Sequence, residues 1–266
     1  MERKNYLYQH HTWQELKALV PQQPVVVQPI GSVEDHGHHL PLDTDNFLIQ
    51  TICEEAARRA NGELLLLPLI PYGFETHHMD FPGTIDIRME NLLNFVLDVT
   101  KSIAHHGFKR ILLADGHGSN MPILEMVARR TILETDSLCG AFIWPSLAAQ
   151  EIQAVRESER GGMAHAGELE TSVYLHLDGS RVQMEKAVKE MGMPRSDFIF
   201  LDLMDSSPIK FMDIWTRFSK SGVYGDPNTA TVDKGRVIFE AVVSAFLNLI
   251  REFKRRPDGR RMDHHQ

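Results

Sequence analysis

Four short and almost uninterrupted apolar runs limit what this chain of 266 residues can fold into. They occupy residues 25–30, 64–70, 110–114 and 140–144. Within each run, apolar residues mostly follow one another instead of alternating with polar ones, which is typical of parallel strands that are covered on both faces. We therefore predict a mainly parallel sheet that is built from these four runs.

Helical periodicity fills the segments between and after the runs. Apolar residues recur at helical spacing in residues 46–60, 92–103, 123–133 and 233–253. Strands that alternate with helices predict the α/β class, here a three-layer α/β/α sandwich with right-handed crossovers. No linker rich in Ser, Gly or Pro divides the chain, so we predict a single domain over residues 1–266 that ends in a flexible tail at about 256–266.

Charge and cysteine usage narrow the functional classes. The net charge of −8 and the pI near 5.9 argue against a nucleic-acid partner, since proteins of that class carry basic patches. No apolar run is long enough to cross a membrane, and no signal peptide is apparent at the start. Cys53 and Cys139 lie in apolar segments, as buried reduced thiols do, so we expect a cytoplasmic protein.

Metal-binding side chains gather directly after the first run. Glu34 and His36 are two residues apart, so in an extended segment they point to the same face. Asp45 can return to that face after the turn residues Gly37 and Pro41. Carboxylate and imidazole ligands together suit Zn²⁺, Mn²⁺ or Fe²⁺. The three side chains together predict a metal site, although Asp45 alone also fits as the cap of the next helix.

A second group of polar residues follows the third run. His117 stands between Gly116 and Gly118, and glycines let the backbone turn sharply as it leaves a strand. In parallel sheets, ligands bind beyond the carboxyl ends of the strands, so Glu34 and His117 are expected at the same edge. The alternative for His117 is a histidine in a capping loop.

A third group lies near the start of a predicted helix. His165 and Glu168 are three residues apart, which places them on one helix face. We interpret Glu168 as a metal ligand with a catalytic role, and His165 as a proton donor or a group that polarises the substrate. Glu170 is interpreted as a buried or interfacial structural carboxylate. The alternative for Glu168 is a carboxylate that only complements the helix dipole.

The loop at residues 72–84 follows the second run, is polar in its middle and is expected to lie over the site. It carries Glu75 and His78, and the turn after the third run carries Ser119. We place these three side chains against a polar substrate, with His78 as the best candidate. A solvated loop without a role is the alternative.

Four blocks, which occur in order within residues 25–176, resemble the creatininase (creatinine amidohydrolase) family. The first is Glu34-x-His36-Gly37 with Leu40-Pro41-Leu42-x-Thr44-Asp45, and the second is Phe81-Pro82-Gly83-Thr84. The others are Gly116-His117-Gly118-x-Asn120 and His165-Ala166-Gly167-Glu168-x-Glu170-Thr171-Ser172.

This resemblance implies a three-layer α/β/α fold, two divalent metal ions per chain and a homo-oligomer, commonly a hexamer. It assigns metal binding to Glu34, His36, Asp45, His117 and Glu168. Asp45 is implied as the carboxylate that bridges the two ions, and His165 as the catalytic or substrate-orienting histidine.

The chain departs from creatininase proper at two places. Ser119 stands where creatininase proper has a glutamate, and Glu168 is expected to supply the missing ligand instead. Residues 156–162 contain no aromatic side chain, whereas creatininase proper has tryptophans shortly before the histidine that matches His165. Because a flat heterocycle gains from aromatic stacking, this difference argues against creatinine as the substrate.

The predicted function is that of a metal-dependent hydrolase. A water that two metal ions activate would attack a cyclic amide or another amide C–N bond of a small polar substrate. One alternative is the same chemistry on a cyclic polyol ketone or a lactone. Another is a metal-binding protein without catalysis, which the placement of His165 argues against. Residues 181–224 show little periodicity, and a lid and a subunit contact both remain open for them.

Overall fold

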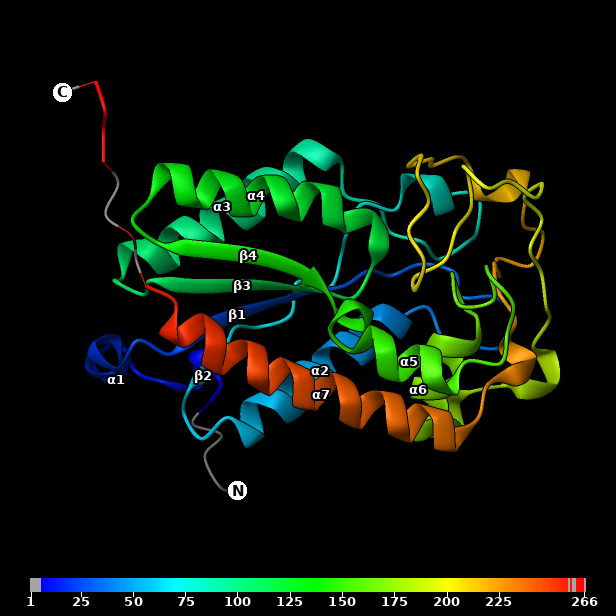
Figure 1. The fold of residues 1–266 in the computed structure, drawn as a ribbon, viewed down its shortest axis with the longest axis horizontal. Coiled ribbons are helices and arrows are strands. Elements are labelled where there is room, and N and C mark those ends of the chain that lie inside the picture. The colour runs from blue at the N-terminus through cyan, green and yellow to red at the C-terminus, as the bar shows by residue number, and fades with distance from the viewer. Residues whose placement is uncertain (1–5, 258, 260–261, 266) are drawn as a thin grey trace.

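A four-stranded parallel sheet forms the centre of the molecule. The computed structural model describes residues 6–257, 259 and 262–265. Its strands are β1 (Val25–Ile30), β2 (Leu64–Leu66), β3 (Arg110–Asp115) and β4 (Leu138–Ile143), in the order β2-β1-β3-β4 (Figure 1). The predicted parallel sheet is therefore confirmed. β2 is shorter than the predicted run 64–70 because Pro68 has no N–H to donate, and pairing returns only as a single bridge at Ile70.

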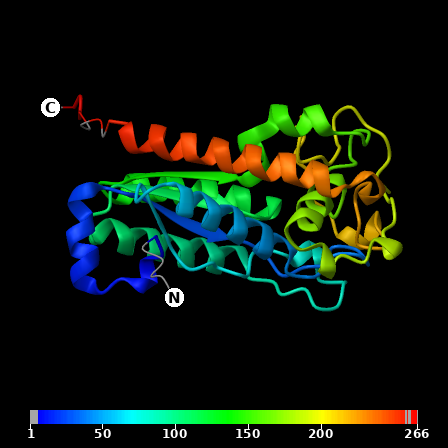
Figure 2. The same ribbon diagram turned by 90° about the horizontal axis from the view of Figure 1, so that it is seen from below.

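Helices cover both faces of the sheet, as predicted. Those expected from periodicity are α2 (Thr44–Arg59), α3 (Met89–His105), α4 (Met121–Glu134) and α7 (Val232–Arg255). The helix expected near residue 168 is α6 (Glu168–Asp178), and the structure adds α1 (Trp13–Leu19) and α5 (Ala149–Val155). Figures 1 and 2 show α2 and α7 on one side of the sheet and α3 and α4 on the other.

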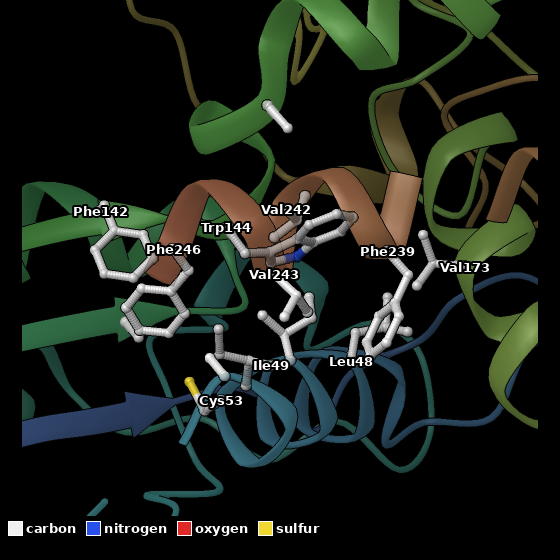
Figure 3. Close-up of a cluster of buried hydrophobic side chains, with 14 of the residues drawn as sticks. Leu48, Ile49, Cys53, Phe142, Trp144, Val173, Phe239, Val242, Val243 and Phe246 are labelled. Atoms are coloured by element: carbon white, nitrogen blue, oxygen red, sulfur yellow. The ribbon is translucent and has the colours of Figure 1, made fainter. Parts of the chain in front are cut away.

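Alternate residues of each strand feed two separate hydrophobic cores. In β1, Val25 and Val27 join the core beneath α2, α6 and α7, whereas Val26 and Ile30 join the core beneath α3 and α4. This alternation follows from the two-residue period of a strand. Figure 3 shows the first core, in which side chains of α7 such as Phe239 and Phe246 lie above those of α2.

The carboxyl ends of the strands point toward an irregular part of the molecule. There α6 and the segment 181–231, which contains short 3₁₀ turns such as Trp215–Arg217, lie against the loops that leave the sheet (Figure 1). None of the helices in the described residues is long and apolar enough to cross a membrane. Of the predicted tail at 256–266, residues 258, 260, 261 and 266 lie outside the described residues.

Candidate metal centre

The loops after β1 and β3 bring ligands together at the carboxyl edge of the sheet. β1 and β3 are neighbours, and the N–H of Gly116 donates to the carbonyl of Ile30 at 2.8 Å. The chain therefore leaves both strands at the same place, with Glu34 on one loop and His117 on the other. α2 adds Asp45 from its first turn, and α6 adds Glu170 from its own.

One group of ligands, which we call the His117 site, consists of Glu34, Asp45 and His117. Nδ1 of His117 lies 3.0 Å from Oε1 of Glu34 and 3.0 Å from Oδ2 of Asp45. All three side chains are buried. The hydroxyl of Ser32 donates to Oδ2 of Asp45 at 2.8 Å and so fixes the orientation of that carboxylate.

The second group, the His36 site, consists of His36, Asp45 and Glu170. Nε2 of His36 lies 3.2 Å from Oδ1 of Asp45 and 3.8 Å from Oε2 of Glu170. The two oxygens of Asp45 thus face different histidines. A carboxylate in this position could serve both ligand groups. Asp45 has no role as a helix cap, since Asp43 holds the cap position of α2.

The chemistry of these side chains fits divalent metal ions. Both oxygens of Glu34 and Nε2 of His36 are buried and make no hydrogen bond of full geometry among the described residues, although His117 and Asp45 lie 3.0 and 3.2 Å from them. A buried charge without a partner is costly, and a bound cation would remove that cost. Mixed oxygen and nitrogen ligands of this kind suit Zn²⁺, Mn²⁺ and Fe²⁺.

The electrostatics of these side chains point the same way. Burial raises the pKa of Glu34 well above its usual range, and the nearby carboxylate of Glu75 raises it further. Burial also raises the pKa of Glu170 to about 7. Burial opposes ionisation of Asp45 as well, but His36 and His117 outweigh it and hold its pKa below the usual value. A positive charge among these buried carboxylates would therefore stabilise their ionised forms.

The assignment of Glu168 as a metal ligand is wrong. Its side chain is buried. Its oxygens accept hydrogen bonds from the backbone N–H groups of Glu157 and Ser158, and Oε1 forms an ion pair with Nζ of Lys234 at 2.7 Å. Glu170 enters the His36 site in its place. Residues two apart in a helix point about 200° apart, so only one of these glutamates can face the site.

His165 lies beside the ligands, as predicted. Its Nε2 is 2.7 Å from the backbone oxygen of Asp35, which can only accept, so Nε2 carries the proton. Nδ1 then has a free lone pair and lies 3.5 Å from Oε1 of Glu34. Burial, reinforced by His36, keeps the pKa of His165 well below its usual value. A neutral imidazole is therefore aimed at the centre.

The three predicted substrate contacts already have protein partners. Nδ1 of His78 lies 2.7 Å from Oδ1 of Asp35, and Ser119 Oγ lies 3.0 Å from Nε2 of His77. Oε2 of Glu75 lies 2.8 Å from Nε2 of His117. The structure thus brings all three close to the candidate metal ligands, but the carboxylate of Glu75 faces His117. Whether His78 and Ser119 contact a substrate stays a prediction.

Trp215 is a site residue that the sequence did not reveal. Its indole packs on the rings of His78 and His165, with centroid distances of 4.4 and 5.1 Å, and it is buried. The indole N–H donates to the carbonyl of Gly222. The lack of aromatic residues at 156–162 therefore does not leave the site without one. Trp215 lies 50 residues beyond His165 in a segment without periodicity, so no local pattern points to it.

Asp35 also went unnoticed, although it stands between two predicted ligands. Its carboxylate holds His78 and its backbone oxygen holds His165, so it orients two imidazoles at once. Gly222 makes this possible, because a Cβ at that position would lie 2.2 Å from Oδ2 of Asp35. A sequence signal existed only in the density of acidic residues and histidines at 34–39.

Comparison with known proteins agrees with the geometry. The family model "Creatininase: Creatinine amidohydrolase" matches residues 9–250. A mycofactocin precursor peptide peptidase from Mycobacterium ulcerans (strain Agy99) is 32% identical over 247 residues, which are 89% of this chain and 88% of that protein. A 3-dehydro-scyllo-inosose hydrolase from Thermotoga maritima is 24% identical, with 98% of this chain and 88% of that protein covered.

A solved structure described as "Creatininase Mn" shares the fold. It superposes with a TM-score of 0.77 at 25% identity, over 93% of this chain and 98% of that one. The family match covers nearly the whole chain. This chain belongs to the creatininase family of metal-dependent amidohydrolases.

Proposed function

We propose that this protein hydrolyses an amide C–N bond, cyclic or open, in a small polar substrate other than creatinine. Two divalent ions would be held at the His117 and His36 sites, with Zn²⁺ favoured over Mn²⁺ and Fe²⁺. The observation that carries the proposal is the carboxylate of Asp45, whose two oxygens face different histidines. Such ions, when bound, lower the pKa of water from about 15.7 toward about 7 and polarise a carbonyl.

The protein's own contribution begins with His165. Because its Nε2–H is donated to the backbone of Asp35, the free lone pair at Nδ1 faces the centre. His165 can therefore take up a proton at Nδ1 and pass it to the leaving nitrogen. General acid–base catalysis of this kind contributes about 10²–10⁴ in rate.

The second contribution is a dry surrounding. His77, His78 and Trp215 are buried and pack ring against ring over the ligands. Exclusion of water strengthens each electrostatic interaction within the site. Asp35 keeps His78 in one orientation, so that its Nε2 remains directed toward Glu34 at 3.7 Å.

Two relatives support hydrolysis but differ in the bond that their names imply. The peptidase acts on a precursor peptide, which supports an amide bond as the target here. The inosose hydrolase supports the alternative, the opening of a cyclic polyol ketone or lactone with the same chemistry. A metal-binding protein without catalysis is disfavoured, because the His117 and His36 sites are complete without His165. We further propose a cytoplasmic homo-oligomer without nucleic-acid or membrane partners.

The test is a hydrolysis screen with metal-loaded protein, over lactams, formamides, short peptides, creatinine and cyclic sugar ketones. Release of an amine from a panel member other than creatinine is expected. Release of acid without amine would support the ketone or lactone alternative instead. The control variant is His165→Ala, which should keep its metal but lose at least about 100-fold in kcat. Absence of turnover on the whole panel, with both ions bound, would contradict the proposal.

A further inference from the structure

Glu75 is directed at a metal ligand instead of at a substrate. It lies on the loop after β2, and its side chain is fully buried. Oε2 is 2.8 Å from Nε2 of His117, the ring nitrogen that faces away from the His117 site. Among the described residues, neither oxygen of Glu75 has a hydrogen bond of full geometry, and the same holds for Nε2 of His117; the carboxylate of Glu34 also lies nearby. The 2.8 Å approach places the His117 ring within reach of this buried carboxylate.

The two nitrogens of the His117 ring have different tasks. A neutral imidazole carries one proton, and a carboxylate can only accept, so a proton at Nε2 satisfies Glu75. Nδ1 then keeps its lone pair and faces Glu34 and Asp45, both at 3.0 Å. We propose that Glu75 is a positioning residue: its carboxylate accepts the Nε2 proton of His117 and holds the ring in the tautomer that offers Nδ1 to a divalent ion.

The backbone around Glu75 is built to keep this contact. The N–H of Glu75 donates to Oδ1 of Asp86 at 2.8 Å, and the N–H of Phe74 donates to Oδ1 of Asn120 at 2.9 Å. Asn120 follows His117 by three residues, so the same turn that carries the His117 ring also holds the backbone next to Glu75. Gly73 permits the close approach, because a Cβ there would lie 2.5 Å from Oδ1 of Asn120 and 2.7 Å from Oε1 of Glu75.

The competing interpretation is an additional ion held by Glu75, His77 and His117, whose ligand atoms also lie close together. It requires the lone pair of His117 at Nε2, which would then be lost from Nδ1 and from the His117 site. Nε2 of His77 already faces the hydroxyl of Ser119 at 3.0 Å. The observations therefore favour a carboxylate that orients a ligand.

The test compares Zn²⁺ binding, measured by chelator competition, in the wild type and in three variants of Glu75. Glu75→Ala should weaken one of the two bound equivalents by about 10–100-fold and leave the other unchanged. Glu75→Gln keeps the side-chain length and an acceptor oxygen but loses the negative charge. Glu75→Asp keeps the negative charge, but its side chain is one methylene shorter. The glutamine variant should stay closer to the wild type. This pair decides the question even if Glu75→Ala fails to fold.

A spectroscopic measurement separates this role from a purely structural one. With Co²⁺ in place of Zn²⁺, the visible absorption of one of the two ions should change in Glu75→Ala and largely recover in Glu75→Gln. Thr76→Ala is the matched control, because it removes a hydroxyl bond to Asp86 from the same loop but leaves Glu75 in place. The control should bind both ions like the wild type.

Three results would overturn the proposal. If Glu75→Ala binds each of the two Zn²⁺ ions as tightly as the wild type does, Glu75 has no role in metal binding, and the proposed function is unaffected. A third ion in the wild type, lost in both Glu75→Ala and His77→Ala, would make Glu75 a ligand. The role of Glu75 also rests on the proposed function, so a wild-type chain that binds no ion would remove both.

Discussion

Two glutamates in the first turn of α6 face different surroundings. Both are buried, yet Glu170 faces the His36 site and Glu168 faces Lys234. The sequence could not decide between them, because the choice depends on how α6 is rotated about its axis. In the observed rotation α6 packs closely on α7, since a Cβ at Gly235 of α7 would lie 1.9 Å from the carbonyl oxygen of Ser172 in α6.

Two matched substitutions test this assignment. Glu170→Gln should lose one of two metal equivalents, because it removes a ligand of the His36 site. Glu168→Gln should keep both equivalents but lower the free energy of unfolding by about 1–3 kcal/mol, since it breaks a buried ion pair. Metal analysis and thermal unfolding of both variants measure the two effects. Loss of metal from Glu168→Gln alone would reverse the assignment.

Acid sensitivity gives an independent test of Glu168. Burial opposes its charge, but Lys234 and the contacts with Ser158 outweigh burial and lower its pKa. A lowered folded pKa stabilises the protein above the unfolded value of about 4.3, and this stabilisation is lost as the pH falls through the folded pKa. The stability difference between wild type and Glu168→Gln should therefore shrink below about pH 4. A difference that stays constant down to pH 3 would contradict it.

Among the elements, the ligands at the strand ends could be predicted from the sequence, but the segment around Trp215 could not. Glu34 and His117 follow apolar runs, and the rule that ligands gather at the carboxyl ends of parallel strands brings them together. The neighbouring positions of β1 and β3 confirm it. Trp215 reaches the site from a segment with no period of either 2 or 3.6, so nothing local indicates where it packs. Its position is set by tertiary contacts, among them those with His78 and His165.

The segment around Trp215 is expected to control access to the ions. Thr216 donates to Asp80 at 2.6 Å, which ties this segment to the loop that carries His77 and His78. Trp215→Ala should lower the free energy of unfolding by about 3–5 kcal/mol and speed the removal of metal by a chelator. Trp215→Phe should show both effects more weakly. The exposed Trp13 offers a control, and equal extraction rates in Trp13→Ala and Trp215→Ala would refute a covering role.

At the scale of the whole molecule, the layered architecture followed from the sequence because every apolar run became a strand and each periodic segment became a helix. α1 and α5 escaped prediction since each has only seven residues, too few for a clear period. The single domain over residues 1–266 stays a prediction. For residues 181–224, a lid and a subunit contact both remain predictions. Trp215 packs over the site, as a lid residue would, and the same segment exposes apolar side chains, as a subunit contact would.

An oligomer is predicted at this scale. Apolar side chains of one segment are exposed to solvent: Phe198, Ile209, Phe211, Met212 and Ile214. Exposed apolar groups that gather in one segment are typical of protein–protein contacts. Light scattering at micromolar concentration should give a mass above 30.3 kDa, and Phe211→Lys should lower it. Phe95→Lys, at an exposed apolar residue of α3, should not. A monomeric wild type would contradict the prediction.

Elemental analysis after loading with Zn²⁺ tests whether two divalent ions share Asp45. The wild type should bind two ions per chain, and His117→Ala should keep one, because the His36 site does not use His117. Asp45→Ala should lose both, since each site depends on that carboxylate. A wild type that binds no ion after loading, or two ions in both variants, would show that these residues do not form a binuclear metal centre.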